Sequence, residues 1–365
     1  MAMYLPLKFI EQVERYIQLP AQRQFENLVN TRAMNFIDAY FNDNRDKFYH
    51  DYIGCRLKSD ANKFVDISKY RDLCTKFYKS VGVEGRAFED LDDFLNLAIY
   101  YNTRSEWRAN KLSYIVDNKL FDTLMEMSYV KSAPTDCVTK LPSSCFYIDY
   151  NNRGSEICEG LLGSFLISSQ GETDTSLLMV HLIKSKKLSR ILYLTTPYYL
   201  GHNGNDTFMP PVSHINNEIL CEDEVTRCID NKKLSKFLFN FLLYLGSVNK
   251  DVEISERTRK NHSNTENKVI KNKFREVKEF EVGFTFGKTI KKDAVRVKYV
   301  DGDDVDKDKP KAKGISKCSH YRSAHWHHYW VGSGDEKKLV TKWIQGVFVN
   351  TGKPSSKNVK VHKVK

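Results

Sequence analysis

No run of about 18 consecutive apolar residues, the length that a membrane-spanning helix requires, occurs in this 365-residue chain. The N-terminal sequence also reaches Glu11 and Glu14 before it has built the apolar stretch of a secretory signal. These absences argue against a membrane protein and against a secreted one. We therefore expect a cytoplasmic protein without a membrane partner.

Close cysteine pairs are absent as well. The eight cysteines are scattered along the chain, and no two of them are spaced C-x-x-C. In a cytoplasmic protein of this size, isolated cysteines are typically reduced and buried thiols. Without paired ligands the sequence favours no zinc site built on cysteine, and we expect neither a metal nor a cofactor.

Proline and glycine are modest in number, at 9 and 18 residues, whereas hydrophobic residues make up 41% of the chain and aromatic residues 12%. This composition supports a packed core and argues against extended disorder. A chain of this length commonly forms two domains. We expect a helical domain at residues 1–134, an α+β domain at 135–352 and a basic tail at 353–365.

The first 134 residues carry apolar side chains at helical spacing. The later amphipathic runs in this half are Tyr70–Val81, Phe88–Tyr101 and Leu112–Met127. Such stripes are what any packed helix needs, and no group of residues here suggests catalysis.

The pattern changes after Cys137, where short β-rich runs alternate with Gly, Asn and Asp turns. Strands are predicted at 145–149, 163–168, 176–183 and 190–195. An apolar helix at Lys232–Val248 is expected to cross under the sheet, a polar linker to occupy 255–275, and a hairpin-like pair to follow at Lys278–Val300. The predicted fold is α+β, with an N-terminal helical domain followed by a mainly antiparallel sheet domain and its crossing helix.

One segment, residues 319–350, is unusually rich in rings. It holds four of the ten histidines and three of the four tryptophans. Glycine and aspartate at 331–335 predict a turn, and aromatic and β-branched runs at 321–331 and 339–349 flank it. The sequence therefore predicts a β-hairpin.

Successive side chains of a strand point to opposite faces of the hairpin. The set that we call the histidine face, and expect to be functional, is His325, His327 and Tyr329. The set that we call the tryptophan face is Trp326, His328 and Trp330. The side chains expected to form the core of the hairpin are Trp326, Trp330 and Trp343.

The residues of this segment allow three kinds of chemistry. Paired histidines could serve as acid and base of a metal-independent ribonuclease, with Arg322 or Lys342 stabilising charge at phosphorus. His-x-His could supply two metal ligands, but no third ligand has a suitable spacing. A rigid aromatic platform with cations nearby could instead bind a peptide or unstacked bases without catalysis, and an exposed strand edge could accept a peptide strand.

The segment also contains a longer motif. It reads His320-x-Arg322-x-x-His325-Trp326-His327-x-Tyr329-Trp330-x-Gly332-x-Gly334, then Lys342-Trp343 and Val347-Phe348-Val349-Asn350-x-Gly352. This motif resembles the C-terminal signature of the second named family of type V-A anti-CRISPR inhibitors (AcrVA-two-like), carried by phages and other mobile elements of bacteria. Segments at 141–149 and 284–288 are more weakly similar. Ser323 stands where the family usually has a second Arg, Ala324 replaces a Gly, and Gln345-Gly346 replaces a Pro-containing step.

The resemblance implies an anti-CRISPR protein that acts in the cytoplasm of a bacterial host cell. It implies inhibition of the biogenesis of a type V-A effector (Cas-twelve-a), by recognition of its nascent N-terminal segment and loss of its messenger RNA. The ribosome or the messenger would then be further partners. We expect a recognition protein rather than an enzyme, and the residues expected to bind the ligand or peptide are His320, Arg322, His325, His327, Tyr329, Lys342 and Asn350.

Two alternatives remain open: the metal-independent ribonuclease and a general RNA- or ribosome-binding module. The charge is relevant to the second. The chain has a net charge of +11, and the last 29 residues, Lys337 to Lys365, contain eight lysines and no acidic residue. Such clusters are typical of proteins that bind polyanions, and also of solvated tails.

Overall fold

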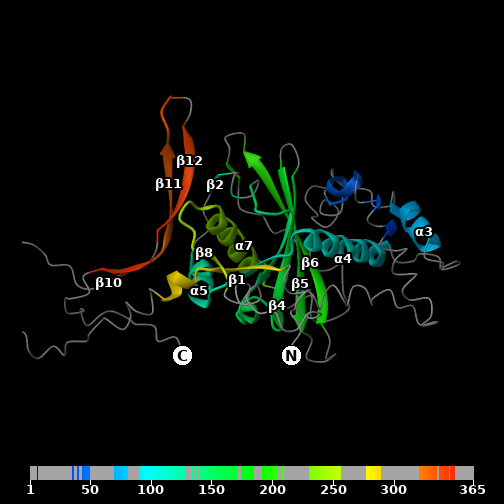
Figure 1. The fold of residues 1–365 in the computed structure, drawn as a ribbon, viewed down its shortest axis with the longest axis horizontal. Helices are drawn as coiled ribbons and strands as arrows, with labels where there is room; N and C mark the ends of the chain where they lie inside the picture. The colour runs from blue at the N-terminus through cyan, green and yellow to red at the C-terminus, as the bar shows by residue number, and fades with distance from the viewer. Residues whose placement is uncertain are drawn as a thin grey trace, which may run out of the picture.

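The centre of the fold is a mixed β-sheet (Figure 1). The structure is a computed structural model. It describes residues 6, 35–36, 39–40, 43–49, 70–80, 91–127, 133–134, 137, 140–170, 174–184, 191–203, 207–208, 230–255, 277–288, 320–334, 337–344 and 346–349. Across the sheet the strands are β2 (Ala133–Pro134), β7 (Thr207–Phe208), β6 (Ile191–Asn203), β5 (Asp174–Lys184), β4 (Leu161–Gln170), β3 (Cys145–Asp149), β1 (Leu112–Val116), β9 (Lys278–Val282) and β8 (Val252–Ile254).

Most neighbouring strands are antiparallel, as predicted. β3, β4, β5 and β6 follow one another as a meander. The exception is β1, which lies parallel to β3 on one side and to β9 on the other, with Leu112 opposite Lys278. The α+β class is confirmed.

One prediction was wrong at β1. The segment Leu112–Met127 was expected to be helical throughout, but its first part is a strand. Only its second part is a helix, α5 (Asn118–Glu126), which begins where the side chain of Asp117 accepts hydrogen bonds from two backbone N–H groups. Lys111, with φ of 48°, separates β1 from the preceding helix. β1 is buried on both faces, and a short apolar run of this kind cannot be distinguished from a helix by spacing alone.

Helices cover both faces of the sheet. One face packs against α7 (Asn231–Gly246), which is the predicted crossing helix, and α7 also contacts α5. Phe237 and Phe241 of α7 lie in a large apolar core with Phe146 of β3. The other face is covered by α4 (Leu91–Asn110), whose Trp107 packs edge-on against Phe165 of β4. A further helix, α3 (Arg71–Ser80), contacts α4.

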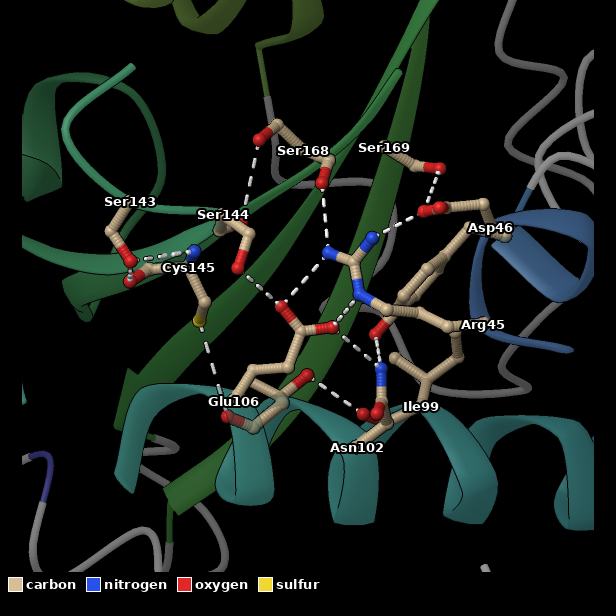
Figure 2. A network of polar contacts seen from close by, with 12 residues as sticks. Arg45, Asp46, Ile99, Asn102, Glu106, Ser143, Ser144, Cys145, Ser168 and Ser169 are labelled. Atoms are coloured by element: carbon tan, nitrogen blue, oxygen red, sulfur yellow. Dashed lines mark hydrogen bonds and ion pairs between the residues drawn. The ribbon is translucent and has the colours of Figure 1, made fainter. Parts of the chain in front are cut away.

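A partly buried ion pair joins the N-terminal helical residues 43–49 to α4 and the sheet (Figure 2). The guanidinium of Arg45 donates to both carboxylate oxygens of Glu106 in α4 and, at 2.9 Å, to the carbonyl of Ser168 in β4. The Ser144 hydroxyl, at 3.0 Å, and the Asn102 amide, at 3.1 Å, also donate to Glu106. Burial opposes the charge of Arg45, but the hydrogen bond and charge of Glu106 outweigh it and raise its pKa. The cluster is a structural junction with every charge paired.

The C-terminal hairpin consists of two pairs of short strands, β11 (His325–Val331) with β12 (Lys338–Ile344) and, at the base, β10 (His320–Arg322) with β13 (Val347–Val349). β11 and β12 project from the side of the molecule that carries α7 (Figure 1). β9 also lies where a strand was predicted, but it pairs with β1 and β8, and residues 284–288 are helical rather than extended. The remainder of the predicted pair, the polar linker beyond Ser255 and the basic tail lie outside the described residues.

The four cysteines that the structure describes, Cys74, Cys137, Cys145 and Cys158, are buried and form no disulfide bond. Among the described helices, none combines the length and apolar character that crossing a bilayer would require.

Candidate functional site

The predicted hairpin is confirmed, and its register is defined. β11 pairs antiparallel with β12, which places Trp326 opposite Trp343 and His327 opposite Lys342. β10 pairs with β13 at the base, so the hairpin continues on both sides of a short break at residues 323–324. Gly332 and Gly334 have φ values of 107° and 58°, which glycine adopts without strain and which the turn requires.

The base of the hairpin is anchored by a cluster of rings. Trp343 is only 1% exposed and packs edge-on against Tyr244 of α7, with 5.3 Å between ring centroids. Phe286 approaches the same indole at 6.1 Å, and Trp326 contacts it across the two strands at 4.7 Å. The prediction of a core position is confirmed for Trp343, while Trp326 is half-buried against the core.

Two asparagines fix the same base by hydrogen bonds. The Asn249 side chain donates to the backbone carbonyl of Trp343 at 2.6 Å and accepts from its N–H at 2.9 Å, so it occupies the position of a neighbouring strand. Asn240, fully buried in α7, donates to the carbonyl of Leu124 at 2.9 Å and accepts from the indole N–H of Trp326 at 3.2 Å. At the base of the hairpin, the backbone of Trp343 and the side chain of Trp326 are therefore both hydrogen-bonded to the rest of the protein.

The prediction for the tryptophan face was wrong at Trp330. Trp330 was expected in the core with Trp326, but its side chain is 67% exposed. The side-chain alternation is as predicted, since Trp326 and His328 are half-buried whereas His325, His327 and Tyr329 are exposed. The difference is one of distance along the strand, because Trp326 contacts Tyr244 and Asn240 of α7, whereas Trp330 lies four residues farther toward the turn.

The histidine face is open to solvent. The rings of His327 and Tyr329 are stacked, with centroids 4.2 Å apart and planes inclined by 28°. Lys342, directly opposite His327, is exposed, and so is Arg322 at the base. The structure thus gathers five of the seven predicted ligand-binding residues on the hairpin; His320 lies in β10 without a described side chain, and Asn350 is outside the described residues.

His328 differs from the other histidines of β11. Its Nδ1 lies 3.1 Å from the Thr341 hydroxyl across the hairpin, while its Nε2 is buried without a hydrogen-bond partner among the described residues. Burial, and then the neighbouring charge of His327, lower its pKa, so the ring favours the neutral form.

The catalytic and metal alternatives gain no support from this geometry. Within the described part of the chain, no three His, Cys, Asp or Glu side chains are grouped so that they could hold a metal ion. His325 and His327 lie two residues apart on an open strand face, and no described cavity encloses them. General acid–base catalysis needs a placed substrate between its two groups.

A buried polar chain in the sheet was not found from the sequence. The Ser164 hydroxyl lies 2.7 Å from Nδ1 of His181, whose Nε2 is 2.9 Å from the Thr196 hydroxyl, and Tyr150 contacts Ser164 at 2.9 Å. Ser164 and His181 resemble a nucleophile and its base, but both are completely buried. Burial lowers the pKa of His181 to about 3. No substrate reaches this pair, and its role is to satisfy polar groups between β4, β5 and β6.

A cavity of about 440 Å³ lies at the N-terminus of α5, beside Phe284 and Lys288. Its charged groups are largely paired with one another, because Arg153 bonds Asp122 and Asp117 caps the helix. The cavity therefore has fewer charged groups available to bind a ligand than the open face of the hairpin has.

The family whose model matches this chain is described as AcrVA2-like, the anti-CRISPR type V subtype A2 family, and the match covers residues 114–351. That is more than half of the chain, from β1 to the end of the hairpin. The chain belongs to the AcrVA2-like family. It is therefore an anti-CRISPR protein, and the family match extends well upstream of the C-terminal motif.

Similarity between this AcrVA2-like protein and a solved structure is more distant. The crystal structure of AcrVA2 is 17% identical in sequence, with a TM-score of 0.44, over 87% of this chain and 97% of that one. None of the curated proteins compared with this AcrVA2-like sequence matches it.

Proposed function

We propose that this AcrVA2-like protein blocks the biogenesis of a type V-A effector by binding the effector's nascent N-terminal segment on the C-terminal hairpin, and that loss of the effector's messenger RNA follows. The observation that carries the proposal is the exposure of Trp330 at 67% on a strand whose base is locked into the domain. A large rigid ring held in solvent by a fixed support is typical of binding hot spots.

The edge of β11 supports an extended ligand. β11 and β12 form a two-stranded sheet of their own, so the outer edge of β11 pairs with no other described strand. An extended peptide can add to such an edge through its main chain and place alternate side chains on the two faces. A chain emerging from a ribosome has not yet folded, so its backbone groups are free to pair in this way.

The tryptophan face then supplies the contacts that select the peptide. Trp330 stands opposite Leu339, which makes an apolar surface directly beside the open edge. Binding at micromolar concentration corresponds to about −8 kcal/mol, which a few buried aromatic contacts can supply.

The first test is calorimetry on the full chain with a synthetic peptide of the effector's N-terminal segment. We expect micromolar binding, a loss of tenfold or more with Trp330→Ala, and little change with Val347→Ala. Val347 is a matched control because it is also an exposed apolar residue of the hairpin, at 43%, but lies at its base. Absence of binding by the folded wild-type protein at high peptide concentration would contradict the proposal.

The second test separates recognition of peptide from recognition of message in cells. The effector gene is recoded synonymously over its first codons, so that the RNA changes and the peptide does not. The protein should still lower the level of the recoded messenger, and should fail when the peptide is altered. Protection by synonymous recoding would show that the nucleotide sequence, and not the nascent chain, is recognised.

A further inference from the structure

The histidine face and the tryptophan face of the C-terminal hairpin differ in charge as well as in the type of ring they carry. On the histidine face, the exposed cation Lys342 stands directly beside His327, because residues opposite each other in a ladder project to the same side. On the tryptophan face, the corresponding cross-strand residues are Leu339, Thr341 and Trp343, none of which is charged. This segregation indicates that the faces serve different ligands.

We propose that the histidine face is a contact surface for single-stranded RNA, separate from the peptide surface on the opposite side. His327 and Tyr329 already form a stack of two exposed rings, at 4.2 Å between centroids. An unpaired base has a flat π-face of similar size and can extend such a stack whatever its sequence. This inference goes beyond the proposed function, and only the separation of the two surfaces rests on it.

The exposed cations of the hairpin fit a phosphate backbone. Lys342 flanks the rings, Arg322 is exposed at the base of the hairpin and Lys337 is exposed beside the turn. None of the hairpin residues that the structure describes, 320–334, 337–344 and 346–349, is acidic. Positive charge beside stacking rings is the arrangement that single-stranded nucleic acids favour.

The shape of the hairpin favours RNA over a second protein segment on this face. Tyr329 is 41% exposed, and no described cavity adjoins the stack to enclose a side chain. Flat rings and point charges hold bases and phosphates without a pocket, whereas peptide specificity generally requires side-chain pockets or an apolar patch. The most exposed aromatic ring of the hairpin lies on the other face, at Trp330.

The deciding experiment uses two neighbouring residues that point in opposite directions. Binding of the full-length protein to a fluorescein-labelled single-stranded oligoribonucleotide, oligo(U) or oligo(A), is measured by anisotropy. Tyr329→Ala should weaken RNA binding by about tenfold, the scale of one lost base stack. Trp330→Ala is the matched control and should leave RNA binding within about twofold of wild type while it impairs peptide binding.

Charge provides an independent arm of the same experiment. Lys342→Ala should weaken RNA binding and reduce the slope of log K against log salt by about one, as expected for one lost phosphate contact. Saturating the wild-type protein with the effector's N-terminal peptide should leave RNA binding in place, because the surfaces are separate.

Four outcomes would overturn the inference. The first is failure of the folded wild-type protein to bind RNA at low salt. The second is unchanged RNA affinity in both Tyr329→Ala and Lys342→Ala, which would place the contact elsewhere, for instance in the basic tail. The third is loss of peptide binding rather than RNA binding in Tyr329→Ala, which would make the histidine face a protein surface. The fourth is displacement of RNA by the peptide. Failure of the proposed function alone would instead appear as intact RNA binding with no peptide binding.

Discussion

Trp343 and Trp330 lie on the same face of the same hairpin, yet the first is 1% exposed and the second 67%. The base of the hairpin meets Tyr244, Phe286 and the two asparagines, whereas the distal part of β11 extends past α7 (Figure 1). The comparison teaches that alternation along a strand determines which side a residue faces. Whether that side is buried depends on where the neighbouring helix ends.

The largest expected effect tests this comparison directly. Trp343→Ala should lower the free energy of unfolding by about 3–5 kcal/mol, because it leaves a cavity in a packed aromatic cluster. Trp330→Ala should change the free energy by less than about 0.5 kcal/mol, as surface substitutions usually do. Urea unfolding followed by circular dichroism measures both. Equal losses would mean that the distal part of the hairpin is buried after all.

Removing the asparagine clamp should give the next largest effect. Asn249→Ala deletes two hydrogen bonds to the backbone of Trp343 and should cost about 2 kcal/mol, since each bond contributes about 1 kcal/mol. The hairpin should then loosen at its base while the sheet stays intact. Hydrogen exchange would show faster exchange in β12 and unchanged protection in β4. Uniformly faster exchange would indicate that the hairpin and sheet unfold as one unit.

Acid should destabilise the sheet through His181. Its pKa is about 3 in the folded protein, against about 6.5 when unfolded. Between these values the unfolded chain binds a proton that the folded protein does not, so stability falls as pH falls below about 6.5. The loss is about 1.4 kcal/mol at pH 5.5.

The variant His181→Gln should flatten this dependence of unfolding free energy on pH. Ser164→Ala is the control, because it removes a hydrogen-bond partner but keeps the titrating ring. It should lower stability at every pH and retain the slope. An unchanged slope in His181→Gln would assign the acid sensitivity to another group.

The smallest effect on stability is expected on the histidine face. His327→Ala and Tyr329→Ala should each alter the free energy of unfolding by less than about 0.5 kcal/mol, because both side chains are exposed. Inhibition of the effector in cells should nevertheless be lost. A folded variant that inhibits as well as wild type would remove this face from the function.

The local sequence pattern was sufficient to predict the hairpin, its turn and the face on which each histidine of β11 lies. It also sufficed for α7 and the meander, where apolar periodicity and turn residues agree. It failed for β1, because a run of five residues, four of them buried, fits a helix and a strand equally well. The pairing of Leu112 with Lys278 decides that choice, and no local pattern reports it.

The candidate site was predictable only in part, for the same reason. The ring-rich composition of residues 319–350 identified the hairpin, but the exposure of Trp330 depends on contacts with α7. Asn240 and Asn249 carry no motif, and their importance follows from what the fold places beside them. The chain joining Ser164 to His181 was likewise hidden, since it is formed by strands that meet only in the sheet.

The position of β1 has a consequence for synthesis of the protein itself. β1 is made early, but one of its two partners, β9, is made after most of the chain. Until Lys278–Val282 has left the ribosome, β1 has an open edge and the sheet is incomplete. Such long-range pairing is slow to form. An inhibitor proposed to act on unfinished chains is thus itself unable to complete its core until its own translation is nearly over.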